Sequence, residues 1–164
     1  MDEEITIEPA ANGGSAAGLV DVSEAYVRFE SSGELYALDL PAVREVVSAA
    51  PLSRIPRAPP AAVGLMNHGG RVYTIVDLAA LEKGEKGEAR SRVVLLDDPS
   101  RLIGIAVDHV EGIGPLHVQG DLARFGDRAV AVVRLEDLIR DIDSAFESSS
   151  MLVFSKPART SKEF

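Results

Sequence analysis

Short apolar runs, mostly of β-branched residues, alternate with turn residues through the middle of the chain. Ala25–Ser31 alternates polar and apolar side chains, and Glu34–Leu40 does so again after the tight turn Ser32-Gly33. A period of two is typical of a strand whose two faces meet different surroundings. The pattern therefore predicts a β-hairpin with one face in solvent.

Two more hairpins are predicted from turn residues. Within Gly64–Leu78, the pair Gly69-Gly70 separates two apolar runs. A two-residue hairpin turn requires positive φ, which glycine adopts without a steric penalty. Asp97–Ser100 supplies the third turn, because aspartate, proline and serine favour turn conformations.

Three runs are apolar without alternation: Val93–Leu96, Leu102–Val107 and Ala129–Val133. Such runs indicate strands that are covered on both faces. In a small β protein, this requires two sheets or barrels that share a core. The predicted fold class is therefore all-β.

Three segments depart from the strand pattern. Pro41–Val47 predicts either a helical turn started by its proline or an extended connector. The four prolines of Pro51–Pro60 cannot donate hydrogen bonds within a ladder, so this segment is predicted to be a stiff crossing between hairpins. A closing amphipathic helix is predicted where apolar residues recur at helical spacing, at Leu135, Leu138, Ile139, Ile142 and Phe146.

The two ends of the chain show no sustained period. Residues 1–18 are rich in alanine, glycine and acidic residues, which predicts a flexible leader, and the domain is expected to span residues 19–146. Residues 147–164 are predicted to form a flexible or weakly docked tail. Its apolar patch Met151–Phe154 leaves open that the tail adds a strand.

The charge balance argues against several classes of partner. The 164 residues include 26 acidic and 17 basic ones, a formal net charge of −9. Binding to nucleic acid or anionic lipid depends on clustered lysine and arginine, so we expect neither nucleic-acid binding nor membrane insertion. The chain has no cysteine, no basic signal-peptide start and no apolar run of membrane-spanning length. These features favour a soluble, cytoplasmic protein.

Candidate catalytic and metal-binding groups have simpler explanations. The histidines His68, His109 and His117 match no metal-ligand spacing, so no metal site is predicted. Paired carboxylates lie in a turn or on a helix, where the backbone or solvent accounts for them. Gly69-Gly70 and Gly112-Ile113-Gly114 lack the context of a phosphate loop. We therefore predict no enzymatic activity and no cofactor, and instead a protein-binding module that uses open sheet edges.

Four segments carry recognisable motifs: YALDLPAVREVV, RIPRAPPAAVGLMNHGGRVYTIVDL, RVVLLDDPSRLIGIAVDHVEGI and RAVAVVRLEDLI. Their elements are V-x-E-V, P-x-A-P followed by G-x-x-N-x-x-G, the V-D-L that closes the second hairpin, and the G-I-x-V-D strand. In this order, and over about Tyr26 to Ile142, the segments resemble the CheW-like domain family. The resemblance implies two five-stranded SH3-like β-barrel lobes around a shared core, with no catalytic activity.

The resemblance also implies a function in chemotaxis. Such proteins are adaptors that bridge the cytoplasmic tip of chemoreceptors and the regulatory domain of a CheA-type histidine kinase. The first hypothesis is therefore a cytoplasmic adaptor recruited to membrane receptor arrays. The second is a divergent module that binds a different regulator, or its own copies, in a chemosensory pathway outside swimming.

Receptor-binding residues are implied position by position. Val43 and Glu45 match the receptor-facing V-x-E element of the family. The hairpin beside the receptor groove is matched by Gly64, Asn67 and Gly70.

Two further residues are implied by the same resemblance. Ile113 stands where the family has an apolar residue in the receptor groove, and Gly104 lies on a strand near the kinase-contacting lobe. The residues by themselves leave other roles open: Val43 as core, Glu45 as a solvated charge, and Asn67 as a side chain that bonds the turn backbone. The glycines are alternatively explained by backbone geometry.

The hairpin departs from the family at one position. Members carry N-L-R-G, with an arginine important for binding, whereas this chain has Gly69 in the arginine's place, within Asn67-His68-Gly69-Gly70. His68 and Arg71 are candidates for supplying the charge from a shifted position, so both join the candidate partner-binding residues. The missing arginine favours the divergent-module hypothesis.

Overall fold

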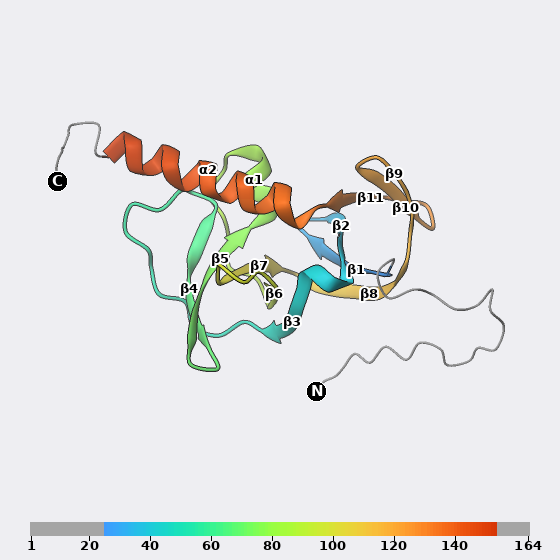
Figure 1. The fold of residues 1–164 in the computed structure, drawn as a ribbon, viewed down its shortest axis with the longest axis horizontal. Coiled ribbons are helices and arrows are strands. Elements are labelled where there is room, and N and C mark those ends of the chain that lie inside the picture. The colour runs from blue at the N-terminus through green and yellow to red at the C-terminus, as the bar shows by residue number, and fades with distance from the viewer. Residues whose placement is uncertain (1–24, 154–164) are drawn as a thin grey trace.

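The computed structural model describes residues 25–153, which form two sheets and a long C-terminal helix (Figure 1). Strands predominate, so the predicted fold class, all-β with a C-terminal helix, is confirmed. The expected leader, residues 1–18, and the part of the expected tail beyond residue 153 lie outside the described residues. Within residues 25–153, no helix combines the length and apolar character needed to span a membrane.

One lobe is a five-stranded sheet in the order β3 (Val43–Ser48), β6 (Arg92–Leu96), β7 (Ile103–Val107), β5 (Arg71–Asp77) and β4 (Ala62–His68). The segment after β3 joins the two edges of this sheet, because Ser53 exchanges backbone hydrogen bonds with Leu65 of β4 at 2.8 and 2.7 Å. The sheet thus closes into a small barrel. Side chains from all five strands fill it: Val47, Met66, Tyr73, Ile75, Val93, Leu95 and Ala106.

The barrel contains the second and third predicted hairpins. Strands β4 and β5 pair antiparallel, as do β6 and β7. β6 and β7 are almost entirely buried, which confirms that these apolar runs are covered on both faces.

The other lobe is a six-stranded sheet in the order β8 (His109–Pro115), β1 (Ala25–Ser31), β2 (Glu34–Asp39), β11 (Arg128–Val133), β10 (Leu122–Phe125) and β9 (His117–Gln119). Five strands were expected. There are six because the chain leaves β7 and, after Asp108 alone, continues as β8 alongside β1. Strands β1 and β2 precede the barrel in sequence and β8–β11 follow it, so the barrel is inserted within this lobe.

The β1–β2 hairpin has the predicted turn, with Ser32 and Gly33 both at positive φ (55° and 82°). The prediction that one of its faces lies in solvent is wrong. Phe29 belongs to the core between the lobes, whereas Leu35 belongs to the six-stranded lobe's own core. Even Arg28 is only 8% exposed. Both faces are covered because the sheet curls over one of them and the barrel packs on the other.

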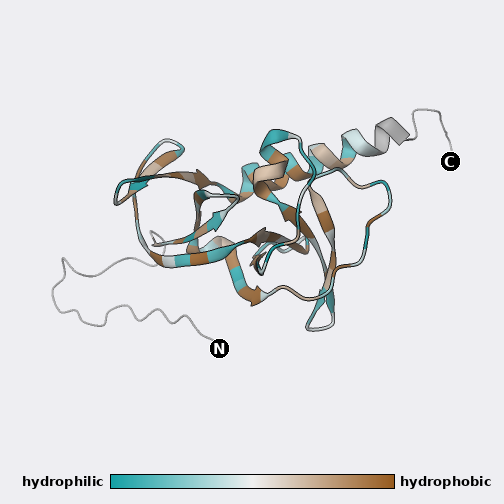
Figure 2. Ribbon diagram, turned by 180° about the vertical axis from the view of Figure 1, so that it is seen from behind, coloured by the Kyte–Doolittle hydropathy of each residue, from teal (hydrophilic) through white to brown (hydrophobic). Residues whose placement is uncertain are grey.

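A core shared by the two lobes is confirmed. It contains Phe29 and Leu38 of the six-stranded lobe together with Val94 and Ile105 of the barrel. Leu138 of α2 (Leu135–Val153) packs in the same core. Figure 1 shows α2 lying along both lobes. Figure 2 shows apolar residues, in brown, on the strands of both sheets and on α2.

The segment Pro41–Val47 combines both structures that its sequence allowed. A short 3-10 turn, η4 (Leu40–Ala42), leads directly into β3. The closing helix is confirmed and continues beyond Phe146 to Val153, so Met151–Val153 is helical rather than an added strand.

The short helix α1 (Leu78–Lys83) was not predicted. The Asp77 side chain caps its N-terminus by accepting a hydrogen bond from the Ala80 amide at 3.4 Å. Gly84 ends it with a φ of 66°. Aspartate before and glycine after a short apolar run are the usual helix boundary signals, and they are present here in D-L-A-A-L-E-K-G.

Candidate protein-interaction site

The β4–β5 turn carries most of the candidate residues. Gly69 and Gly70 both have positive φ (62° and 82°), as a two-residue hairpin turn requires. His68 and Arg71 face each other across this turn. Gly70 therefore has a backbone role, and a side chain at either glycine would strain the turn.

A contact across the mouth of the barrel joins two candidate residues from different strands. The Nε2 atom of His68 in β4 lies 3.3 Å from Oε1 of Glu45 in β3. His68 stands two positions after Met66 in β4, and Glu45 stands two positions before Val47 in β3, and both neighbours belong to the barrel core. Side chains two positions apart on a strand share a face, so His68 and Glu45 lie on the inward faces of their strands. The pair therefore sits over the end of the barrel core, where 51% of the Glu45 side chain is exposed. A partner can replace water around both groups there.

The outward side of the same hairpin is open to solvent. Asn67 and Val72 are opposite each other in the β4–β5 register, and both are exposed, Val72 to 49%. Arg71 is opposite His68 and so lies on the other, inward face, but it is also exposed, and its side chain forms no hydrogen bond or ion pair within residues 25–153. The hairpin end, which is teal in Figure 2, thus presents one apolar side chain surrounded by polar and cationic groups.

A β-bulge shapes the V-x-E segment in β3. The pairing register with β6 shifts between Val43 and Glu45, so Arg44 is the extra residue, and it lies 3.8 Å from Asp97. Val43 is half-buried against the shared core. Val43 thus has the core role that its sequence allowed, whereas Glu45 has a specific partner in His68.

Three other candidate residues have different surroundings. Gly64 is buried, and a Cβ there would come within 2.8 Å of the Ser53 carbonyl oxygen, so it permits the close crossing of two backbones. Gly104 is buried in β7, where a Cβ would lie 2.7 Å from the Val93 side chain. Gly104 therefore has a packing role in the barrel, and its implied position near the kinase-contacting lobe stays a prediction. Ile113 is half-buried on β8, in the six-stranded lobe.

A buried polar cluster around Arg90 was not predicted. Its guanidinium donates to Asp77 at 3.0 Å and to Asp108 at 3.2 Å, which links the aspartates of the V-D-L and G-I-x-V-D elements. Only 2% of the Asp77 side chain and 12% of the Arg90 side chain are exposed. Burial disfavours the charge on Arg90, but the two carboxylates outweigh this effect and raise its pKa. Asp108 also accepts a hydrogen bond from the Ser32 amide at 2.9 Å, so the cluster connects the two lobes.

A second unpredicted feature surrounds Arg28 in β1. Its guanidinium carbon lies 3.8 Å from the centroid of the Phe125 ring, a cation–π contact. A Cβ at Gly112 would come within 2.8 Å of its Nη2 atom, so this glycine makes room for the guanidinium. Burial lowers the pKa of Arg28, and the nearby Glu111 opposes that effect. Gly112 and Gly114, which lack the context of a phosphate loop, thus lie beside an arginine of the same chain.

Within the described part of the chain, the one group of three side chains with metal-ligand atoms close together is Glu30, His109 and Glu111. Their ligand atoms lie within 4.8 Å of one another. Arg128 already forms an ion pair with Glu30, and His109 bonds Glu111 at 3.1 Å. Each of these three side chains thus has a partner within the chain.

Comparison with known proteins agrees with this architecture. The CheW-like domain family matches residues 25–142. The chemotaxis protein CheW of Rhizobium meliloti (strain 1021) is 28% identical over 101 residues, and the match covers 60% of this chain and 65% of that protein, just under two thirds of its length. The crystal structure of the scaffolding protein TtCheW from Thermoanaerobacter tengcongensis is similar in fold, with a TM-score of 0.57 at 22% identity, covering 67% of this chain and 88% of that chain. As the four sequence segments indicated, the chain belongs to the CheW-like domain family.

Proposed function

We propose that this chain is a non-enzymatic chemosensory adaptor that couples chemoreceptors to a CheA-type histidine kinase in the cytoplasm. The observation that carries the proposal is the contact between Glu45 and His68. These two residues come from separate segments that the family resemblance assigns to the receptor-facing side, and the fold brings them to one barrel mouth. The proposed mechanism is the formation of protein contacts without any covalent step.

The hairpin end has the composition of an exchangeable interface. Burying one aliphatic side chain such as Val72 contributes about 1 to 3 kcal/mol. Asn67, Arg71 and Glu45, at the same end of the barrel, add direction and register, but exposed ion pairs contribute little affinity. We assign this end to the receptor tip. The kinase regulatory domain requires a separate surface, since a typical stable interface covers roughly 800 Å² on each partner.

Charge reversal at the barrel mouth tests the receptor assignment. Glu45→Lys removes the partner of His68 and places two basic groups together, so we expect capture of a purified receptor tip to fall several-fold. The thermal melt should be unchanged because the side chain is half-exposed. Asp127→Lys is the matched control, since it reverses another exposed acidic residue, in the turn between β10 and β11. Equal capture by both variants would contradict the assignment, and loss of folding by Glu45→Lys would indicate a structural role.

A second function is favoured by the turn itself. Gly69, in the place of the family's arginine, has a φ of 62°, a backbone conformation that favours glycine over residues with a side chain. The chain would then be a divergent module that binds another regulator or its own copies. Arg71→Ala tests whether the shifted arginine compensates, and unchanged affinity for receptor and kinase would remove it from the interface. Co-purification with a CheA-type kinase but no receptor would favour the divergent module.

A further inference from the structure

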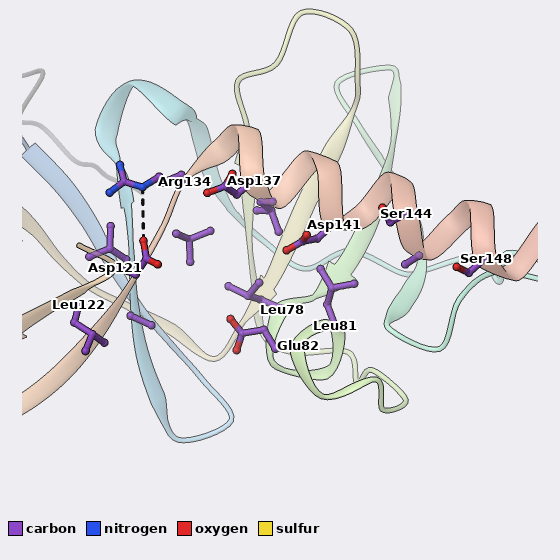
Figure 3. A pocket seen from close by; sticks show the side chains of 15 residues that line it. Leu78, Leu81, Glu82, Asp121, Leu122, Arg134, Asp137, Asp141, Ser144 and Ser148 are labelled. Atoms are coloured by element: carbon purple, nitrogen blue, oxygen red, sulfur yellow. Dashed lines mark ion pairs between the residues drawn. The ribbon is translucent and has the colours of Figure 1, made fainter. Parts of the chain in front are cut away.

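A groove of about 750 Å³ lies between α1, α2 and β11, on a side of the molecule that the receptor proposal does not use (Figure 3). Its floor is apolar and includes Leu78 and Leu81 of α1, Ala131 and Val133 of β11, and Leu138 of α2. Figure 3 shows Asp137, Asp141, Ser144 and Ser148 in a row along α2 above this floor. This spacing of three and four residues places all four on one helix face.

The rim of the groove carries an excess of negative charge. Four acidic side chains line it, Glu82, Asp121, Asp137 and Asp141, against one basic residue, Arg134. Arg134 lies 3.8 Å from Asp121, as the dashed line in Figure 3 marks.

The other two acidic positions on α2 differ in their partners. Asp137 is 2.5 Å from Arg140. The Asp141 side chain has no hydrogen bond or ion pair within residues 25–153.

Glu82 adds to the negative charge of the groove. Its carboxylate accepts a hydrogen bond from the Tyr36 hydroxyl at 3.4 Å. Burial raises the pKa of Glu82, and the neighbouring carboxylates of Glu34 and Asp141 raise it further, although the Tyr36 hydrogen bond and Lys83 oppose them. A cation in the groove would relieve this repulsion.

The two ends of the chain differ in their fit to such a groove. Residues 1–24 contain six acidic residues and no lysine or arginine, so the groove repels them. Residues 154–164, FSKPARTSKEF, contain Lys156, Arg159 and Lys162 against a single glutamate, with a phenylalanine at each end. Basic side chains suit the rim and aromatic ones suit the floor, so charge and hydrophobicity both select the C-terminal segment.

The C-terminal segment is also long enough to reach the groove. Ser148, which lines the groove, precedes the end of α2 at Val153 by little more than one turn. Returning from Val153 to the level of Asp137 requires roughly 24 Å at about 1.5 Å per residue. The 11 residues that follow span up to roughly 36 Å when extended. Pro157 disfavours continuation of the helix and so favours a change of direction.

We propose that residues 154–164 fold back and dock in the groove between α1, α2 and β11, with their basic side chains against its acidic rim. The contact is intramolecular and salt-sensitive, because it depends on partly exposed charges. Docking would cover the apolar residues of α1, α2 and β11 that line this groove.

A spin label on the C-terminal segment tests the proposal in the full chain. The chain has no cysteine, so Ser161→Cys provides a single attachment site. We expect paramagnetic loss of the amide signals of Leu81, Ala131 and Ala145, which line the groove. The loss should diminish at about 0.5 M salt, where charges are screened within a few ångströms. It should also diminish when Lys156 and Arg159 are both changed to Glu.

Matched variants make the result specific. The same label at Ser15→Cys, in the acidic N-terminal segment, should leave the groove signals unchanged. In the Ser161→Cys protein, Asp141→Lys should restore the groove signals, whereas Asp127→Lys should not. Absence of signal loss at the groove, or a loss insensitive to all the charge changes, would overturn the proposal. Signal loss that arises only between labelled and isotope-enriched unlabelled molecules in a mixture would also overturn it, because the occupant would then be a second copy.

Discussion

Replacement of Arg90 should destabilise the protein far more than replacement of any surface arginine. Arg90→Met keeps the length of the side chain but removes the donor at 3.0 Å from Asp77, whose side chain is 2% exposed. Asp77 then retains only backbone donors, the amides of Ala80 and Glu88 at 3.4 and 3.0 Å. Removing one partner of a buried ion pair costs about 3 to 5 kcal/mol, because the remaining charge stays buried without compensation.

The size of this effect decides how it is measured. Domains of this length are stable by about 5 to 15 kcal/mol, so the change is a large fraction of the total. Urea unfolding followed by circular dichroism should show a much lower midpoint with an unchanged slope, since the folded surface is the same. By contrast, Asp108→Asn should cost less than about 1 kcal/mol, because 41% of the Asp108 side chain is exposed and solvent screens its charge.

A double variant separates the charge effect from a loss of packing. Asp77→Asn in the Arg90→Met background removes the buried charge and keeps a side chain that caps α1 well. The double variant should therefore be more stable than Arg90→Met alone. A loss below about 1 kcal/mol for Arg90→Met, or no recovery in the double variant, would refute the reasoning that an uncompensated charge is responsible.

Three further outcomes are expected. Gly104→Ala should lower stability by about 1 to 3 kcal/mol in urea unfolding, because its methyl group enters a filled barrel; an unchanged midpoint would contradict the packing role. Glu82→Gln should raise the urea midpoint at pH 7, because a carboxyl whose pKa is raised by folding destabilises the folded state once the pH exceeds its ordinary pKa of 4.5. The gain should vanish below pH 4.5, and a gain independent of pH would contradict this reasoning. Arg101→Ala, which breaks a half-exposed ion pair with Asp143 at 2.6 Å, should leave the midpoint within error, and a clear loss would show that the pair is structural.

The hairpins and the shared core were predictable because the determining signals are local. Gly69-Gly70 fixes a turn through its own φ values, and the uninterrupted apolar runs of β6 and β7 require cover on both faces. The β1–β2 hairpin was misjudged because its charged residues look like a solvent face. Arg28 is instead covered by Phe125, and Glu30 is paired with Arg128, both from a distant hairpin.

The candidate site was predictable residue by residue but not as a geometry. Glu45 and His68 were identified through separate segments, and nothing local indicates that they touch. Their contact requires the barrel to close between β3 and β4, which depends on the crossing segment at Ser53. The Arg90 cluster was missed for the same reason, since Asp77 ends β5 whereas Asp108 follows β7.

The insertion of one lobe within the other also sets an order of events during synthesis. Leu35 of β2 cannot pair with Val130 of β11 until nearly all of the described chain has left the ribosome, whereas the strands of the barrel are complete earlier. Pairings so distant in sequence carry a large loop-closure entropy and form slowly. The apolar residues of the β1–β2 hairpin therefore stay exposed until β11 is synthesised. The six-stranded lobe is then completed against a barrel that has already formed.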